Sequence, residues 1–308
     1  MQSTSGPASS RTPFILITLA IVLALVGIVG IAIGGADKPD DKVASTGTTT
    51  TSLDSSTSST VPGATVSTVP GATTTTAKKG TTGTTAPITA TTVSAACPAP
   101  SPAAADPAAS STAPATGTYT YISCTDSSDT QQSKIAAGAS GDGVTRRTVS
   151  SSAAGFDQTA TVAYGPTGVL LESIAINSPQ GKITCDWKPD VQNYPASLNV
   201  GTTWNANSSC DLKQESGASP GKLSLTATGK VTGKVAVNVG GTVVNAWVIE
   251  SSIKLTTNVA FGSTTVTVNA LSHYDPAHGL DVYRHSQTHS EQGDMTRDEH
   301  LASLTPKN

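Results

Sequence analysis

The sequence predicts an all-β, antiparallel domain that forms a barrel, a half-barrel or a sandwich. Three observations favour this fold class. Apolar and polar residues alternate through the C-terminal half, Gly, Asn and Pro recur between the alternating runs, and no run after Ile33 has the period of an amphipathic helix. Turn signals every ~8–12 residues are typical of an antiparallel meander. We expect one transmembrane helix and a disordered, Ser/Thr/Pro-rich stalk in front of this domain.

Composition divides the 308 residues into five parts. The aromatic residues are Phe14 and a group between Tyr119 and Tyr283, and none lies in the long segment between them. A segment without aromatic side chains buries too little apolar surface to offset its ordering entropy. We therefore expect a cytoplasmic N-terminus (1–13), a transmembrane helix (14–33), a disordered stalk (34–117), an extracytoplasmic β domain (118–290) and a disordered tail (291–308).

The run from Phe14 to Ile33 contains no charged residue. As a helix rising ~1.5 Å per residue, it is long enough to cross the ~30 Å hydrocarbon core of a bilayer. Arg11 precedes the run and an acidic cluster follows it, which fits a single-pass cell-membrane protein with its C-terminal domain outside the cell. The alternative is a cleaved signal peptide, with Gly34 and Ala36 at the −3 and −1 positions. The length of the run favours an uncleaved anchor.

The segment after the anchor is dominated by hydroxyl side chains. Between residues 43 and 95, 28 of 53 residues are Ser or Thr. This composition is typical of an extended, O-glycosylated stalk. As polyproline II, the ~75 residues up to the β domain would reach on the order of 230 Å, which suits the crossing of a thick cell wall. The alternative is a neutral linker, and in either case the segment carries no chemistry.

The alternating runs give the approximate positions of the strands. Gly240 and Gly241 separate two such runs and predict a hairpin. We expect strands near residues 118–124, 143–151, 156–164, 169–176, 182–187, 202–209, 223–228, 235–239, 243–255 and 265–270.

Four cysteines follow the anchor, and an even number in an exported chain predicts two disulfides. Three connectivities are possible, and we favour the sequential pairs Cys97–Cys124 and Cys185–Cys210. The second pair lies in neighbouring predicted strands, where antiparallel pairing brings Cα atoms close enough. Each bridge would contribute ~3 kcal/mol of stability. A four-cysteine zinc site is the alternative, and the lack of a C-x-x-C pair disfavours it.

Three short motifs resemble a bacterial cell-envelope β-domain family of unknown function. They are Tyr-Pro followed by Leu-Asn-Val-Gly-Thr-Thr-Trp (194–204), Val-Gly-Gly-Thr-Val-Val-Asn-Ala-Trp (239–247) and Tyr-Asp-Pro-Ala-His-Gly-Leu (274–280). The resemblance covers residues 194–285, and His273 departs from it where an aromatic residue is expected. It implies a β-rich envelope domain and supplies neither an activity nor site residues.

All five histidines lie in the last 36 residues, and they are the main candidates for chemistry. With Asp275 and Asp281 they offer suitable zinc ligands. However, the sequence has no H-E-x-x-H motif, and we expect surface histidines and no metal site. The histidines are His273, His278, His285, His289 and His300.

Other patterns give no catalytic residue. Asp186 and Asp190 flank Trp187, a pattern that suggests a sugar site, but a solvated turn has the same pattern. We expect Trp187, Trp204 and Trp247 to be core residues rather than stacking platforms. No G-x-S-x-G elbow occurs. Basic residues are scattered, which excludes a nucleic-acid partner.

The sequence therefore predicts a non-catalytic, membrane-anchored surface module with no cofactor. Such a module would bind a cell-wall or surface partner or serve the envelope structurally. The first alternative is a carrier of a lipid or other apolar ligand in a β half-barrel, which requires an internal cavity. The second alternative is a metal-dependent hydrolase that uses the C-terminal histidines.

Overall fold

The structure, a computed structural model, describes residues 97–308 except 154, 155, 179, 180, 218, 261 and 292. Its β-strands are β1 (Ser101–Pro102), β2 (Gly117–Ser123), β3 (Thr130–Ala137), β4 (Thr145–Ala153), β5 (Phe156–Gly165), β6 (Gly168–Ser178), β7 (Gly181–Pro195), β8 (Thr203–Gln214), β9 (Gly221–Val239), β10 (Thr242–Val259), β11 (Gly262–Asp275), β12 (Leu280–Ser290) and β13 (Gly293–Leu301).

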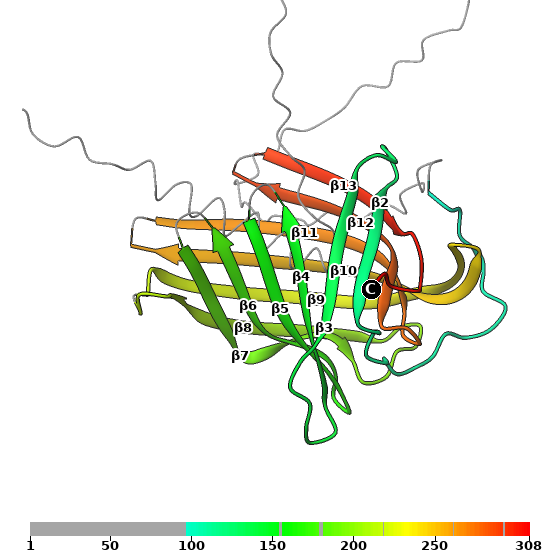
Figure 1. Cartoon of the computed structure of the whole chain (residues 1–308), viewed down its shortest axis with the longest axis horizontal. Coiled ribbons are helices and arrows are strands. Elements are labelled where there is room, and N and C mark those ends of the chain that lie inside the picture. Colours follow the sequence, from blue (N-terminus) through cyan, green and yellow to red (C-terminus); the bar gives the residue numbers. More distant parts are fainter. Residues whose placement is uncertain (1–96, 154–155, 179–180, 218, 261, 292) are drawn as a thin grey trace, which may run out of the picture. The chain divides into compact units, whose positions relative to one another are not determined.

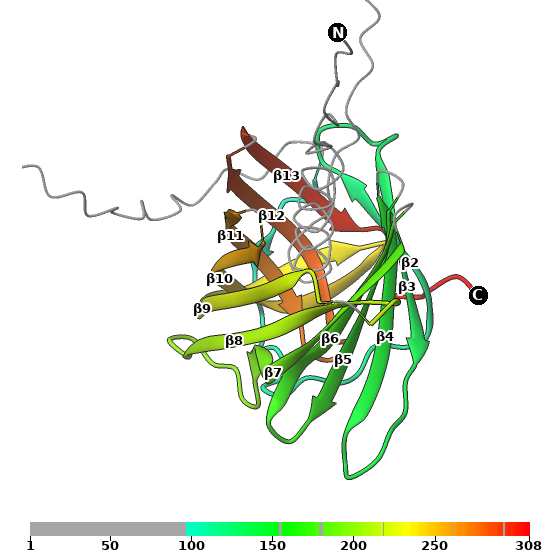
Figure 2. The same cartoon turned by 90° about the vertical axis from the view of Figure 1, so that its left-hand side faces the viewer.

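Strands β2 to β13 form a closed, antiparallel barrel of twelve strands. Each strand pairs with the next one along the chain, and β13 returns to pair with β2. Strands β2–β7 and β8–β13 form two halves of the barrel, which are seen on opposite sides of Figure 2. In Figure 1 the strands of the first half run steeply across those of the second. The all-β, antiparallel prediction is confirmed, and the architecture is a barrel.

The period-two pattern explains the inner surface of the barrel. In β10 Ile249, Ile253 and Leu255 are buried, whereas the intervening Lys254 is exposed. The predicted hairpin joins β9 and β10, and its ladder begins at the pair Val239–Thr242. Gly240 and Gly241 both have positive φ angles, 57° and 90°, which this two-residue connection requires.

Two seams of the barrel have short ladders. Strands β13 and β2 pair only through residues 299–301 and 121–123. Strands β7 and β8 pair at Ile183, Thr184 and Lys188, and no ladder pair follows Lys188 in β7. By contrast, β9 and β10 pair along their whole length.

Residues 97–116, here called the strap, are ordered against the barrel. Trp247 Nε1 donates to the Ala108 carbonyl oxygen at 2.9 Å, and Arg147 Nε donates to the Pro114 carbonyl oxygen at 2.8 Å. Thr112 N donates to the Pro276 carbonyl oxygen at 2.8 Å. The sequence assigned the strap to the disordered stalk (34–117). The structure corrects this part of the assignment. The strap is held by hydrogen bonds from its backbone to the barrel, and such bonds require no hydrophobic pattern in the Ala/Pro-rich sequence.

A second correction concerns the C-terminal region. Residues 291–308 were expected to be a disordered tail, but β13 lies there and closes the barrel through its pairing with β2. Charged residues of β13 form ion pairs with side chains of other strands. The strand therefore needs no apolar alternation, which is the pattern that reveals the other strands in the sequence. Strands β3 and β12 were also not expected from the sequence.

The two predicted disulfides are present as Cys97–Cys124 and Cys185–Cys210. The first joins the strap to the end of β2. The second links β7 to β8 and lies in the main hydrophobic core. Within residues 97–308, apart from the gaps, no helix is long and apolar enough to cross a membrane. The predicted anchor (14–33) and most of the predicted stalk lie outside the described residues.

Candidate binding site in the barrel interior

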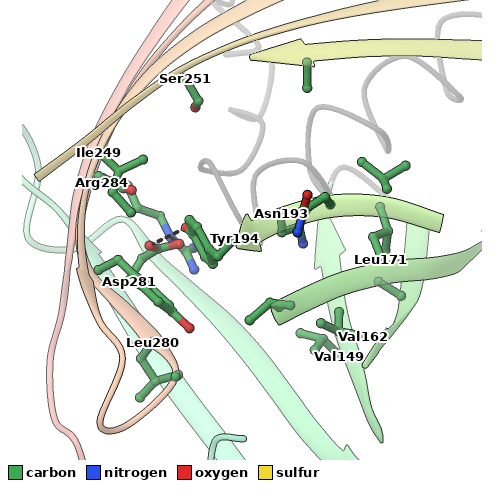
Figure 3. A pocket seen from close by; sticks show the side chains of 18 of the residues that line it. Val149, Val162, Leu171, Asn193, Tyr194, Ile249, Ser251, Leu280, Asp281 and Arg284 are labelled. Atoms are coloured by element: carbon green, nitrogen blue, oxygen red, sulfur yellow. Dashed lines mark hydrogen bonds and ion pairs between the residues drawn. The ribbon is translucent and has the colours of Figure 1, made fainter. Parts of the chain in front are cut away.

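An internal cavity of about 100 Å³ lies inside the barrel, and both halves of the barrel contribute to its wall. Val149, Val162 and Leu171 project into it from β4, β5 and β6. Ile249 projects from β10. These inward positions are the apolar residues of the period-two pattern, so the wall of the cavity is largely hydrophobic (Figure 3).

Five of the six tyrosines in the chain line this cavity. Tyr194 stacks on Tyr274, with ring centroids 4.0 Å apart, and meets Trp204 edge-on at 6.1 Å. The edge-on contact is a favourable geometry for aromatic quadrupoles, and the three rings together form one side of the cavity wall. The tyrosines are Tyr119, Tyr121, Tyr164, Tyr194 and Tyr274.

Trp204 can occupy this wall because a glycine lies beside it. Trp204 is in β8 and pairs with Gly229 of β9. A Cβ atom at Gly229 would come within 2.2 Å of the indole ring, which is far below van der Waals contact. The missing side chain of Gly229 therefore sets the position of Trp204 against the cavity.

A buried polar cluster forms one end of the cavity (Figure 3). Tyr194 Oη donates to Asp281 Oδ1 at 2.9 Å, and Arg284 Nε lies 3.4 Å from Asp281 Oδ2. Arg284 also donates to Tyr121 Oη at 3.0 Å, and its guanidinium carbon lies 4.0 Å from the centre of the Tyr121 ring. The side chains of Asp281 and Arg284 are only 4% and 5% exposed, so their interaction is weakly screened by water.

A second ion pair balances the charges behind this cluster. Arg284 Nη1 lies 3.2 Å from Glu299 Oε1, and Arg297 Nε donates to Glu299 Oε2 at 2.9 Å. Two carboxylates, those of Asp281 and Glu299, thus face two guanidinium groups. A buried charge without a partner destabilises the folded state. The pairing of two negative with two positive groups therefore allows four ionisable side chains to be buried inside the barrel.

Burial also changes the protonation of the cluster. Removal of Asp281 from water raises the pKa of its carboxyl group to about 6, and the neighbouring Arg284 opposes this rise only in part. Burial likewise raises the pKa of the Tyr194 hydroxyl well above its usual value. The end of the cavity therefore carries a carboxyl group that changes its charge in mildly acidic solution.

The lining of the cavity approaches solvent near the short ladder between β7 and β8. Gln192 and Asn193 of β7 line the cavity and are partly exposed, and they follow the last ladder pair at Lys188. Thr228 of β9 also lines the cavity and is exposed. Figure 3 shows Asn193 facing the space between the polar cluster and the aliphatic wall.

The tryptophans and carboxylates singled out in the sequence lie in different surroundings. All three tryptophans are buried, and only Trp204 borders the cavity. Asp186 is exposed and forms an ion pair with Lys213 at 3.5 Å. Trp187, between the two carboxylates, is 3% exposed and offers no surface for stacking a sugar. Partial burial, followed by the charge of Glu172, raises the pKa of Asp190.

The histidines separate into different environments instead of forming one cluster. His278 and His289 pair with Asp275 and Asp294 at 2.6 Å and 3.0 Å. His273 is buried against Tyr283, and burial lowers its pKa to about 4.

His285 and His300 complete the set. His285 is buried, with its Nδ1 atom 2.8 Å from Asp298 Oδ1. His300 lies 3.5 Å from the Sγ atom of Cys97. The expectation of surface histidines therefore fails for His273 and His285, because β11 and β12 have both faces covered in this region.

Sequence reasoning did not find the polar cluster around Asp281 and Arg284. One signal was available, since an arginine within an otherwise buried strand needs a buried acidic partner. The partners Asp281, Tyr121 and Glu299 come from three strands, and β13 was not expected to be a strand.

Comparisons with protein-family models, curated proteins and solved structures found no match to this chain.

Proposed function

We propose that this protein is a non-catalytic binding module that holds a small apolar ligand, or the apolar end of a larger one, inside its barrel. The observation that carries the proposal is the cavity bordered by Trp204, five tyrosines and aliphatic side chains. Ligand sites in proteins are typically concave and apolar, with a few convergent polar groups. Here the convergent groups are Tyr194, Asp281 and Arg284.

The volume of the cavity limits the size of the ligand. It measures about 100 Å³, whereas sites for drug-sized ligands measure ~300–1,000 Å³. An engineered apolar cavity of ~150 Å³ in another protein takes up benzene or xenon. A single ring or a short length of alkyl chain therefore fits, and a whole lipid would place only part of itself here.

The polar cluster favours binding over catalysis. Asp281 is held by Tyr194 and Arg284, and Arg284 is shared with Glu299. A general acid or base must be free to transfer a proton to a substrate, whereas these groups are committed to one another. Each carboxylate oxygen of Asp281 can accept a second hydrogen bond, so the cluster can still orient one hydroxyl group on an otherwise apolar ligand.

Entry through the seam between β7 and β8 is part of the proposal. The ladder is missing after Lys188, and the partly exposed Asn193 lines the cavity beyond that point. A ligand passing there would not have to break a continuous ladder of backbone hydrogen bonds.

The proposed setting is the outer side of the cell membrane, with the chain anchored by residues 14–33. The uncharged 20-residue run and the two disulfides support this setting. A cell-wall or surface partner bound by the outer face of the barrel is the other function expected from the sequence. Among the described residues, the large apolar side chains that are exposed are Val200 and Val243, which gives this alternative little surface to act through.

The test is to fill the cavity from within. Ala160 lines it and is 1% exposed, so Ala160→Leu places extra carbon atoms in the space. Binding of fluorobenzene, a single-ring ligand followed by fluorine NMR, to the full chain in nanodiscs should weaken on the order of tenfold, equivalent to ~1.4 kcal/mol. The control is Ala136→Leu at an exposed position of β3. Equal probe binding by the two folded variants would contradict the proposal.

A further inference from the structure

One disulfide lies beside a histidine. The Sγ atom of Cys97 is 3.5 Å from Nδ1 of His300, and the Sγ atom of Cys124 completes a group whose ligand atoms all lie within 4.8 Å of one another. We propose that, in the dithiol form of the protein, Cys97, Cys124 and His300 bind one Zn²⁺ ion. This site is separate from the barrel cavity and does not depend on the proposed ligand.

The spacing of these atoms matches zinc chemistry. Zinc binds thiolate sulfur at ~2.3 Å and imidazole nitrogen at ~2.0–2.1 Å in tetrahedral geometry, so a sulfur and a nitrogen ligand lie about 3.6 Å apart. The observed separation between Cys97 Sγ and His300 Nδ1 is 3.5 Å. The Cα atoms of Cys97 and Cys124 are 5.0 Å apart, so small side-chain rotations suffice to place both sulfurs around one ion.

The donor set also fits the metal. Two thiolates and one imidazole suit zinc, and three protein ligands leave a fourth position open for water or another donor. Both cysteines are buried, which shields the ion, whereas His300 is partly exposed and provides a path from solvent. Among the described residues, this is the one group of three potential ligands that lie this close together.

Formation of the site requires reduction of the disulfide. A dithiol reductant supplies two electrons and two protons, which break the bond between the two Sγ atoms and leave two thiols, while the dithiol becomes a cyclic disulfide. Zn²⁺ then replaces the two thiol protons, which are released to solvent. A small-molecule disulfide reverses the sequence by thiol–disulfide exchange: it accepts the two electrons and is itself reduced to thiols, while the Cys97–Cys124 bond forms again and the metal is released.

The second disulfide provides an internal comparison. Cys185 and Cys210 lie in the main hydrophobic core, and neither belongs to a group of three potential metal ligands within the described part of the chain. Cys97 and Cys124 instead connect the strap to β2. A zinc ion at this position would keep the strap attached to the barrel when the covalent bond is absent.

The experiment compares oxidised and reduced forms of the full chain in nanodiscs. The protein is reduced with a water-soluble phosphine, desalted without oxygen and titrated with Zn²⁺ and with Co²⁺. We expect one equivalent of metal on the reduced protein and none on the oxidised protein. The Co²⁺ form should show thiolate charge-transfer absorption and the visible bands of tetrahedral coordination.

Variants separate this site from adventitious binding. His300→Gln should weaken zinc binding on the order of tenfold or more, as losses at metal sites usually do. The matched control is His289→Gln, an exposed histidine paired with Asp294, which should leave the affinity unchanged. The proposal is overturned if the reduced, folded chain binds no zinc, or if a Cys97→Ser/Cys124→Ser variant binds it as tightly as the parent.

Discussion

Tyr194 and Asp281 are hydrogen-bonded inside the barrel, with Tyr194 Oη 2.9 Å from Asp281 Oδ1, although 87 residues separate them in the chain. This contact joins β7, at the edge of the first half of the barrel, to β12 in the second half. It also lies where the apolar wall of the cavity meets the buried charges. The same hydrogen bond therefore holds the two halves of the barrel together and places a polar group at the end of an apolar cavity.

The first prediction concerns the pH dependence of stability. An aspartate titrates near ~3.9 in an unfolded chain, and Asp281 titrates at about 6 in the folded protein. Between these values the folded state binds more protons, so the contribution of Asp281 to stability falls as the pH rises through this window. The full change is roughly 3 kcal/mol, from ~1.4 kcal/mol per pKa unit.

Asp281→Asn should remove that contribution. The free energy of unfolding, measured in urea at several pH values, should favour the parent increasingly over the variant as the pH is lowered from 7 towards 4. A difference between parent and variant that stays constant over this range would show that Asp281 does not titrate there.

The second prediction concerns the buried ion pairs. Arg284→Met leaves Asp281 without its cationic partner and weakens the compensation of Glu299, which should cost ~3–5 kcal/mol in the free energy of unfolding. Arg146→Met is the matched control, because Arg146 pairs with Glu172 at 2.8 Å near the surface, where water screens an ion pair and its contribution to stability is small. Chemical denaturation of both variants gives the comparison, and equal losses would contradict the buried network.

The third prediction tests the contact between Trp204 and Gly229. Gly229→Ala places a methyl group within 2.2 Å of the indole ring and should destabilise the barrel by ~1–3 kcal/mol. Gly233→Ala on the same strand meets nothing closer than 3.9 Å and should be tolerated. Thermal unfolding of the two variants measures the difference, and similar melting temperatures would count against this packing.

The fourth prediction concerns topology. If residues 14–33 anchor the chain with its barrel outside the cell, protease added to intact cells should reach the C-terminal region, and thiol reagents should find no free cysteine. Complete protection of the C-terminal region, or four reactive thiols, would contradict the proposed location.

Local sequence patterns predict the strands that have one apolar face. The alternation around Val266 and Val268 and the Gly240-Gly241 turn give β11 and the hairpin, because each pattern depends on neighbouring residues alone. The spacing of the cysteines leaves three connectivities open, and the preference for the sequential one depends on Cys185 and Cys210 lying in neighbouring predicted strands. Strand β11 and the hairpin can therefore be predicted without knowledge of contacts between residues that are distant in the sequence.

The remaining elements depend on contacts that are distant in sequence. Strand β12 places Arg284 inside the barrel and His285 on the other face, and both are buried, so no apolar alternation marks it. Glu299 can be fully buried because its charge is paired with that of Arg284. This ion pair allows β13 to be a strand of the barrel although its sequence is charged. The strap likewise has no pattern of its own. The site was missed for the same reason, since Asp281 acquires its role from Tyr194 and Arg284.

The most direct test of ligand binding uses the fluorescence of Trp204. A Trp187→Phe/Trp247→Phe variant of the full chain keeps Trp204, which borders the cavity, as its only tryptophan. Titration with a short brominated alcohol should quench this fluorescence in a saturable way, because a bromine atom held in the cavity lies against the indole ring. A variant that keeps only Trp187, which is buried away from the cavity, serves as the control. Weak, non-saturating quenching that is equal in the two proteins would contradict the account.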